Sequence, residues 1–205
     1  LLEGGASASD IEAQATLYKV TNFAVVTAAS ASDSYVGGII GYGNNVNIIY
    51  PINSTNSINR DGTTPVYARY VGGIAGYLAG AILGEYDGAN TTYNTSRSTY
   101  FYSGDYSGGL VGASDSLLLH SVVAGGYIDE GASYTGGLLG YSSTNVRIVN
   151  SVNAMNYVRG KVLGTGGFIG YMAGGIVNIK TSRNSAQIMS YGGSGGHRGI
   201  GGFIG

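Results

Sequence analysis

The chain has 205 residues, of which 38 are glycine and only 10% are charged, against about 25% charged residues in an ordinary globular domain. Hydrophobic residues reach 43% and the net charge is -1, so the composition excludes an intrinsically disordered chain and lacks the basic excess of a nucleic-acid-binding protein. Cysteine is absent, which excludes disulfides, zinc–thiolate sites and thiol nucleophiles.

The first expected strand covers residues 17–25, and a pentapeptide that recurs along the chain follows it. Copies of the form Gly-Gly-apolar-apolar-Gly begin at Gly37, Gly72, Gly108, Gly136, Gly166 and Gly201. Their spacing of 28 to 36 residues is the period of a solenoid with variable loops. We therefore expect residues 1–205 to be a single repeat domain that belongs to a longer array.

Short apolar and β-branched stretches lie between the pentapeptides, bounded by Gly, Asn, Ser and Asp. They cover residues 46–49, 81–83, 117–119, 146–149 and 176–179. This pattern is typical of strands and lacks the long glycine-poor windows of a helical solenoid. The sequence therefore predicts an all-β fold, a right-handed parallel β-solenoid (β-helix) built from about six repeats. One apolar ladder should contain Ile39, Ile74, Leu110, Leu138, Phe168 and Phe203.

Tyrosine is the most abundant aromatic residue, with 18 copies against 4 phenylalanines and no tryptophan. Four tyrosines stand two residues before a glycine pair, at Tyr35, Tyr70, Tyr106 and Tyr134, and four follow a pentapeptide, at Tyr42, Tyr77, Tyr141 and Tyr171. Equivalent positions on successive coils form columns, so we expect these rings to stack along the solenoid. Ala113 and Gly164 interrupt the two columns.

Residues 86–106 read as a polar, tyrosine-rich insertion between coils. Exposed aromatic side chains on a polar loop favour a contact surface for a glycan or a protein, although a lid over a coil fits the same pattern. The candidate contact residues are Tyr86, Tyr93, Tyr100, Tyr102 and Tyr106. Three sequons in expected loops make Asn53, Asn90 and Asn94 candidates for glycan attachment.

Catalytic and metal-binding patterns are missing from the sequence. His120 and His197 lie far apart, and neither has a His or carboxylate partner at metal-ligand spacing. The acidic residues are scattered, and their only close pairs are Asp129 with Glu130 and Glu85 with Asp87, while Asp105 could act together with Arg97. The sequence therefore predicts a non-enzyme that has no catalytic, metal or cofactor site.

The segment 134–141, followed by residues 145–154, resembles the GLUG repeat, in which Gly-Leu-apolar-Gly precedes an Ile-x-Asn-Ser-hydrophobic strand. Such repeats occur in large surface-exposed or secreted microbial proteins, including adhesin-like chains and non-catalytic parts of IgA-specific metallopeptidases. The resemblance implies an extracellular or cell-surface structural or adhesive repeat module.

Two alternatives to that module remain open, namely a carbohydrate-binding or carbohydrate-active β-helix and the passive stalk of a secreted peptidase. The expected partners are other copies of the chain, stacked or in a filament, neighbouring repeats, and a glycan or host-surface ligand. Nucleic acid is not an expected partner. No membrane span is expected, because no apolar run approaches roughly 18 residues.

Overall fold

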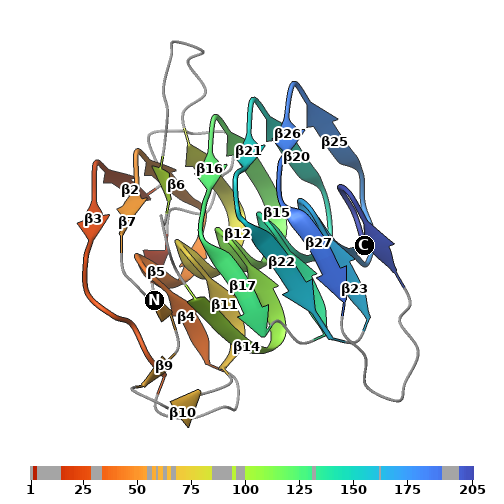
Figure 1. Ribbon diagram of the computed structural model, residues 1–205. Coiled ribbons are helices and arrows are strands. Elements are labelled where there is room, and N and C mark those ends of the chain that lie inside the picture. Colours follow the sequence, from red (N-terminus) through yellow and green to blue (C-terminus); the bar gives the residue numbers. More distant parts are fainter. Residues whose placement is uncertain are drawn as a thin grey trace.

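In the computed structural model, the chain forms a β-solenoid of about four turns, and every regular element in its described part is a strand. The structure describes residues 2–3, 15–28, 34–54, 57–58, 60–61, 64–65, 68–84, 94–95, 100–130, 133–161, 163–190 and 199–205. Figure 1 shows the coils side by side in chain order, from the orange strands to the blue ones. The parallel β-solenoid expected from the sequence is confirmed, with fewer complete turns than the six copies of the pentapeptide.

One turn of the solenoid is clearest between residues 134 and 160, where five short strands follow one another. They are β18 (Tyr134–Gly136), β19 (Leu139–Ser142), β20 (Val146–Val149), β21 (Val152–Asn153) and β22 (Tyr157–Gly160). The pentapeptide makes the bend between β18 and β19. Each of these strands pairs in parallel with its equivalent on the next turn, as a solenoid requires.

The other strands repeat these five positions. At the β18 position lie β4 (Tyr35–Gly37), β11 (Ala68–Gly72), the end of β14 (Tyr100–Gly108), β23 (Gly164–Gly166) and β28 (Ile200–Gly201). At the β19 position lie β1 (Leu2–Glu3), β5 (Ile40–Asn44), the starts of β12 (Ala75–Gly84) and β15 (Val111–His120), and β24 (Ile169–Met172). The later parts of β12 and β15 join β2 (Ala15–Tyr18), β6 (Val46–Ile49) and β25 (Val177–Lys180) at the β20 position.

Shorter strands complete the turns. At the β21 position lie β3 (Thr21–Asn22), β7 (Ile52–Asn53), β13 (Asn94–Thr95), β16 (Val123–Ala124) and β26 (Arg183–Asn184). At the β22 position lie β8 (Ser57–Ile58), the start of β14, β17 (Tyr127–Glu130) and β27 (Gln187–Ser190). Only β9 (Arg60–Asp61) and β10 (Thr64–Pro65) form an antiparallel pair among the described strands. The described part of the chain contains no helix that could span a membrane.

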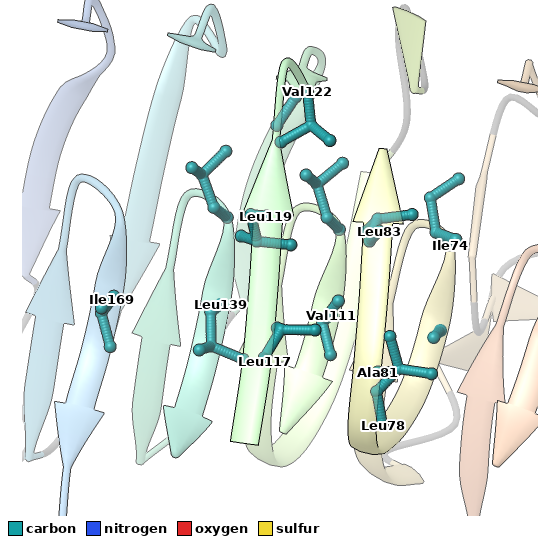
Figure 2. Packing of buried hydrophobic residues seen from close by; sticks show 14 of the residues in the cluster. Ile74, Leu78, Ala81, Leu83, Val111, Leu117, Leu119, Val122, Leu139 and Ile169 are labelled. Atoms are coloured by element: carbon teal, nitrogen blue, oxygen red, sulfur yellow. The ribbon is translucent and has the colours of Figure 1, made fainter. Parts of the chain in front are cut away.

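The core is a set of apolar columns that run along the solenoid axis. Backbone hydrogen bonds of 2.8–3.0 Å join successive members of the expected ladder, which contains Ile39, Ile74, Leu110, Leu138, Phe168 and Phe203. Four of these side chains, Ile74, Leu110, Leu138 and Phe168, are fully buried. Figure 2 shows the neighbouring columns, where side chains such as Leu119 and Leu139 fill the space between the strands. The predicted ladder is therefore confirmed.

Most of the pentapeptide glycines are required by close approach of the backbone, and none of those described has a positive φ. At Gly136, a Cβ atom would lie 2.7 Å from both Gly170 N and Phe168 O on the next coil. Positive φ values of 49–55° occur instead at Lys19, Tyr50, Ser121, Asn150 and Thr181, in the turn that follows the β20 position. Glycine is usually required at a bend either because φ is positive or because another part of the backbone comes close. The second reason is the one that applies to the pentapeptides.

An asparagine ladder inside the solenoid ties the β21 position to the pentapeptide bends. Asn153 Nδ2 donates to Gly167 O at 2.6 Å and to Asn184 Oδ1 at 3.0 Å, and Asn184 Nδ2 donates to Gly202 O at 2.8 Å. Asn153 is fully buried, and its Oδ1 accepts a hydrogen bond from Met155 N at 3.1 Å. The ladder satisfies carbonyl groups at the bends and couples the coil of Asn153 to that of Asn184.

Candidate functional site

The main surface feature is a face made of eight tyrosines, which we call the tyrosine face. Its first column contains Tyr35, Tyr70, Tyr106 and Tyr134, and its second contains Tyr42, Tyr77, Tyr141 and Tyr171. In β18, Tyr134 points outward because the next residue, Thr135, is buried and side chains alternate along a strand. The two columns flank the pentapeptide bends, where glycine has no side chain to separate the rings.

The first column is a continuous stack. Ring centroids lie 4.7 Å apart between Tyr35 and Tyr70, 4.9 Å between Tyr70 and Tyr106, and 5.5 Å between Tyr106 and Tyr134, with interplanar angles of 11–17°. These separations follow the spacing of about 4.8 Å between parallel strands. Tyr70 and Tyr106 each have a stacked ring on both sides, so their faces are covered and their edges point outward.

The second column is interrupted, as the sequence predicted. Tyr42 stacks on Tyr77 at 5.3 Å, and Tyr141 stacks on Tyr171 at 6.0 Å. Between these pairs the equivalent position is Ala113, which is fully buried. The expected stacking of Tyr42 on Tyr77 and of Tyr141 on Tyr171 is confirmed, and each aromatic pair contributes about 0.5–1.5 kcal/mol beyond area burial.

Edge contacts join the two columns into one surface. Tyr35 meets Tyr42 at 5.4 Å with planes at 73°, and Tyr106 meets Tyr141 at 5.0 Å with planes at 60°. At the far end, Tyr134 and Tyr171 lie 4.8 Å apart with planes at 32°. The eight rings therefore form one connected aromatic surface.

An ion pair lies on the first column. The guanidinium of Arg69 is 5.4 Å from the ring centroid of Tyr70 and 5.9 Å from that of Tyr106. Arg69 Nε also lies 3.2 Å from Asp105 Oδ2, and both side chains are more than one third exposed. The cation–π contacts and the ion pair place one positive and one negative charge on an otherwise neutral face.

Burial raises the pKa of three phenols of the tyrosine face. Desolvation, followed by the negative charge of Asp115, raises the pKa of Tyr77 to about 12. Desolvation, followed by the neighbouring tyrosines, also raises the pKa of Tyr134 and that of Tyr141. The face presents ring edges and hydroxyl groups that can donate and accept hydrogen bonds.

Among the predicted contact residues that the structure describes, Tyr106 belongs to the tyrosine face. Tyr100 and Tyr102 lie in β14, which pairs with β8, β11, β17 and β18, so residues 100–106 form a coil strand and are not part of an insertion. The insertion was expected because this segment is polar, but its backbone pairs with strands on both neighbouring coils. Tyr86 and Tyr93 lie outside the described residues.

The sequon at Asn53 does not lie in a loop. Asn53 is in β7 and fully buried, its Nδ2 donates to Gly73 O at 2.7 Å, and its Oδ1 accepts from Asn22 Nδ2 at 3.0 Å. The amide that would carry a glycan is therefore committed to the asparagine ladder, and the expectation that Asn53 is an attachment site is wrong for the folded coil. Asn94 begins β13, and Asn90 lies outside the described residues.

The acids and the histidine that could support catalysis are separated. Asp129 pairs with Arg159 and also accepts from Tyr157 Oη at 3.2 Å, while Asp105 pairs with Arg69. His120 is buried and its Nδ1 lies 3.1 Å from Ser121 Oγ. The described residues contain no group of three or more His, Cys, Asp or Glu side chains that could hold a metal ion. Arg97 and His197 lie outside the described residues.

The fold and the tyrosine face define the class of this protein as a β-solenoid repeat protein with an aromatic surface ladder. Comparisons with protein-family models, curated proteins and solved structures return no match.

Proposed function

We propose that this chain is a non-catalytic structural and adhesive repeat module of an extracellular or cell-surface protein. The observation that carries the proposal is the tyrosine face, a connected surface of eight partly exposed rings held on a rigid stack of coils. Tyrosine combines a large apolar area with a hydroxyl group, so it is enriched where proteins make contacts. The location outside the cell rests on the resemblance of the repeat to GLUG repeats.

The geometry favours an adhesive contact with a protein over the carbohydrate-binding alternative. A sugar that stacks on an aromatic ring needs an open ring face, whereas Tyr70 and Tyr106 are covered on both faces by neighbouring rings. Ring edges and hydroxyl groups are suited to aromatic and polar groups of a protein partner. The carbohydrate-active alternative has less support, because Asp105 and Asp129 are each paired with an arginine.

The adhesion test compares binding to surfaces coated with fibronectin, mucin or cellulose. We expect the protein to be retained on a protein or glycoprotein surface and not on cellulose. The triple variant Tyr70→Ser/Tyr106→Ser/Tyr141→Ser should lose most of this retention, because it removes the centre of the face. Tyr157→Ser, which changes a tyrosine that contacts Tyr127 and lies outside the tyrosine face, should retain it.

Equal retention of the triple variant and the unchanged protein would contradict the adhesive role of the face. Retention on cellulose alone would favour the carbohydrate-binding alternative. Absence of retention on every surface would favour the passive stalk. Circular dichroism of each variant, recorded before the assay, separates loss of contact from loss of the fold.

We also propose that the solenoid stacks on further coils, supplied by a second copy or by neighbouring repeats. At the C-terminal end of the described coils, Ile200 is 55% exposed, although its register partner one coil earlier, Thr165, is 2% exposed. Val177 and Ile179 are half-buried, although their equivalents one coil earlier, Val146 and Ile148, are buried. Another coil would cover these side chains and continue the columns.

Sedimentation velocity over a range of protein concentrations tests stacking between copies. We expect association that increases with concentration and that is lost in Ile200→Lys, because the new charge would be buried in the contact. Ile52→Lys, a charge at an exposed apolar residue on another coil, should leave association unchanged. A monodisperse unchanged protein at high concentration would contradict stacking between copies and leave neighbouring repeats as the partner.

A further inference from the structure

Tyrosine is the residue type of this chain that a one-electron oxidant attacks most readily. The chain contains no cysteine and no tryptophan, so its 18 phenols are the side chains from which a one-electron oxidant most readily removes an electron. Of the three methionines, Met155 is only 2% exposed. Methionine reacts with peroxide by taking up oxygen to form a sulfoxide, which is a different product from that of a phenol.

The tyrosine face brings two phenols together at the end of its first column. Tyr134 and Tyr171 lie 4.8 Å apart, centroid to centroid, with planes tilted by 32°. They come from β18 and β24, on successive coils. Tyr171 is 40% exposed. Both rings can therefore be reached by an oxidant at the surface.

Gly164 provides the space beside this pair. It takes the position in the first column where a fifth tyrosine would follow Tyr134, because the two residues are partners in the register of β18 and β23. A Cβ atom on Gly164 would lie 3.6 Å from Tyr134 Cδ1. No ring therefore stacks on this side of Tyr134, unlike Tyr70 and Tyr106, and its edge can turn towards Tyr171.

We propose that the tyrosine face is a site of oxidative cross-linking, in which Tyr134 and Tyr171 become joined by a carbon–carbon bond when a haem peroxidase acts with hydrogen peroxide. Each phenol loses one electron and its hydroxyl proton to become a phenoxyl radical. The two radicals join through their ortho carbons, and the two ortho hydrogens shift to the oxygens to restore the phenols. The two electrons and two protons reduce one hydrogen peroxide to two water molecules.

The connected rings favour this pair over isolated tyrosines. The ring centroids of Tyr106 and Tyr134 lie 5.5 Å apart, so a radical formed on Tyr106 can take an electron from Tyr134. Because both groups are phenols, this electron exchange has little driving force in either direction. A radical formed on any of several rings can therefore reach Tyr134 and Tyr171, the pair that couples. The product ties two successive coils covalently, which strengthens the solenoid along its axis.

Peroxidase and hydrogen peroxide, applied to dilute purified protein, test the proposal. We expect dityrosine fluorescence and a monomer that has lost two hydrogen atoms. Trypsin should release residues 98–147 joined to residues 162–180, because the chain has cleavage sites at Arg97, Arg147, Lys161 and Lys180. Tyr171 is the only tyrosine of the second peptide, so this product identifies one of the two linked residues directly.

Tyr171→Phe should lower the yield of intramolecular dityrosine by more than half. The matched control is Tyr157→Phe, which removes the phenolic hydroxyl group from a ring that lies 5.1 Å from the Tyr127 ring and is tilted by 55°. This control should leave the yield unchanged. Fragmentation of the joined peptides should place the bond on Tyr134. An unchanged yield in Tyr171→Phe, a bond to another tyrosine of the first peptide, or cross-links only between molecules would overturn the proposal.

Discussion

Gly137→Ala should destabilise the protein by about 3 kcal/mol, the upper part of the usual range for overpacking a core. A Cβ atom at this position would overlap Gly167 O and the amide group of Asn153. The carbonyl belongs to the backbone of the next coil, so it cannot move without displacing that coil. Thermal or urea unfolding followed by circular dichroism measures the change.

The same motif supplies a matched control. Gly202 is also the second glycine of a pentapeptide, but a Cβ atom there would meet nothing within 4 Å. Gly202→Ala should therefore leave the unfolding midpoint nearly unchanged. Equal effects of the two substitutions would mean that the pentapeptide glycines reflect composition and not contact between coils.

Asn153→Asp should be destabilising at neutral pH, by about 3 kcal/mol or more, and much less so in acid. The amide now donates to Gly167 O and Asn184 Oδ1 in a fully buried site. A carboxylate of the same shape cannot donate, and it would place a negative charge against these two oxygens. A protonated carboxyl group can still donate one of these hydrogen bonds.

The pH dependence of this variant has a definite sign. Burial and the facing oxygens raise the folded-state pKa of the introduced carboxyl group above its unfolded value of about 3.9. The stability of the protonated form is therefore fully present below about pH 3.9 and is lost as the pH rises through the folded-state pKa. The measurement is the difference in unfolding free energy between variant and unchanged protein as a function of pH.

Asn178→Asp serves as the control, because Asn178 is exposed on the outside of β25. It should show a small difference from the unchanged protein at every pH. If Asn153→Asp behaved in the same way, the asparagine ladder would contribute little to the contact between coils.

The pentapeptides made the fold predictable, because one motif at a nearly constant period places equivalent residues on successive coils. The apolar ladder through Ile74 and Leu138 and the tyrosine columns follow from this alignment alone. The interruptions at Ala113 and Gly164 could also be read in advance. The connected face required the structure, since the sequence does not show that the two columns touch.

Other features could not be predicted because their residue types have more than one use. Asparagine is a common turn residue, so the sequon at Asn53 indicated a loop. In the structure its side chain points inward and donates a hydrogen bond to the carbonyl of Gly73 at a pentapeptide bend. Residues 100–106 are polar and aromatic, which indicated an insertion, although their backbone pairs with neighbouring coils. In both cases the hydrogen bonds are made to residues distant in sequence.

Engineered disulfides test the stacking of coils most directly, because the chain has no cysteine of its own. Arg147 and Asn178 are partners in the register of β20 and β25, and Leu118 is the partner of Arg147 on the preceding coil. Adjacent parallel strands are about 4.8 Å apart, which suits a disulfide, whereas two coils exceed the limit of about 7 Å between Cα atoms. We expect Arg147→Cys/Asn178→Cys to form an intramolecular disulfide under mild oxidation, and Leu118→Cys/Asn178→Cys to stay reduced. A disulfide in the second variant, or none in the first, would contradict the solenoid register on which the tyrosine face depends.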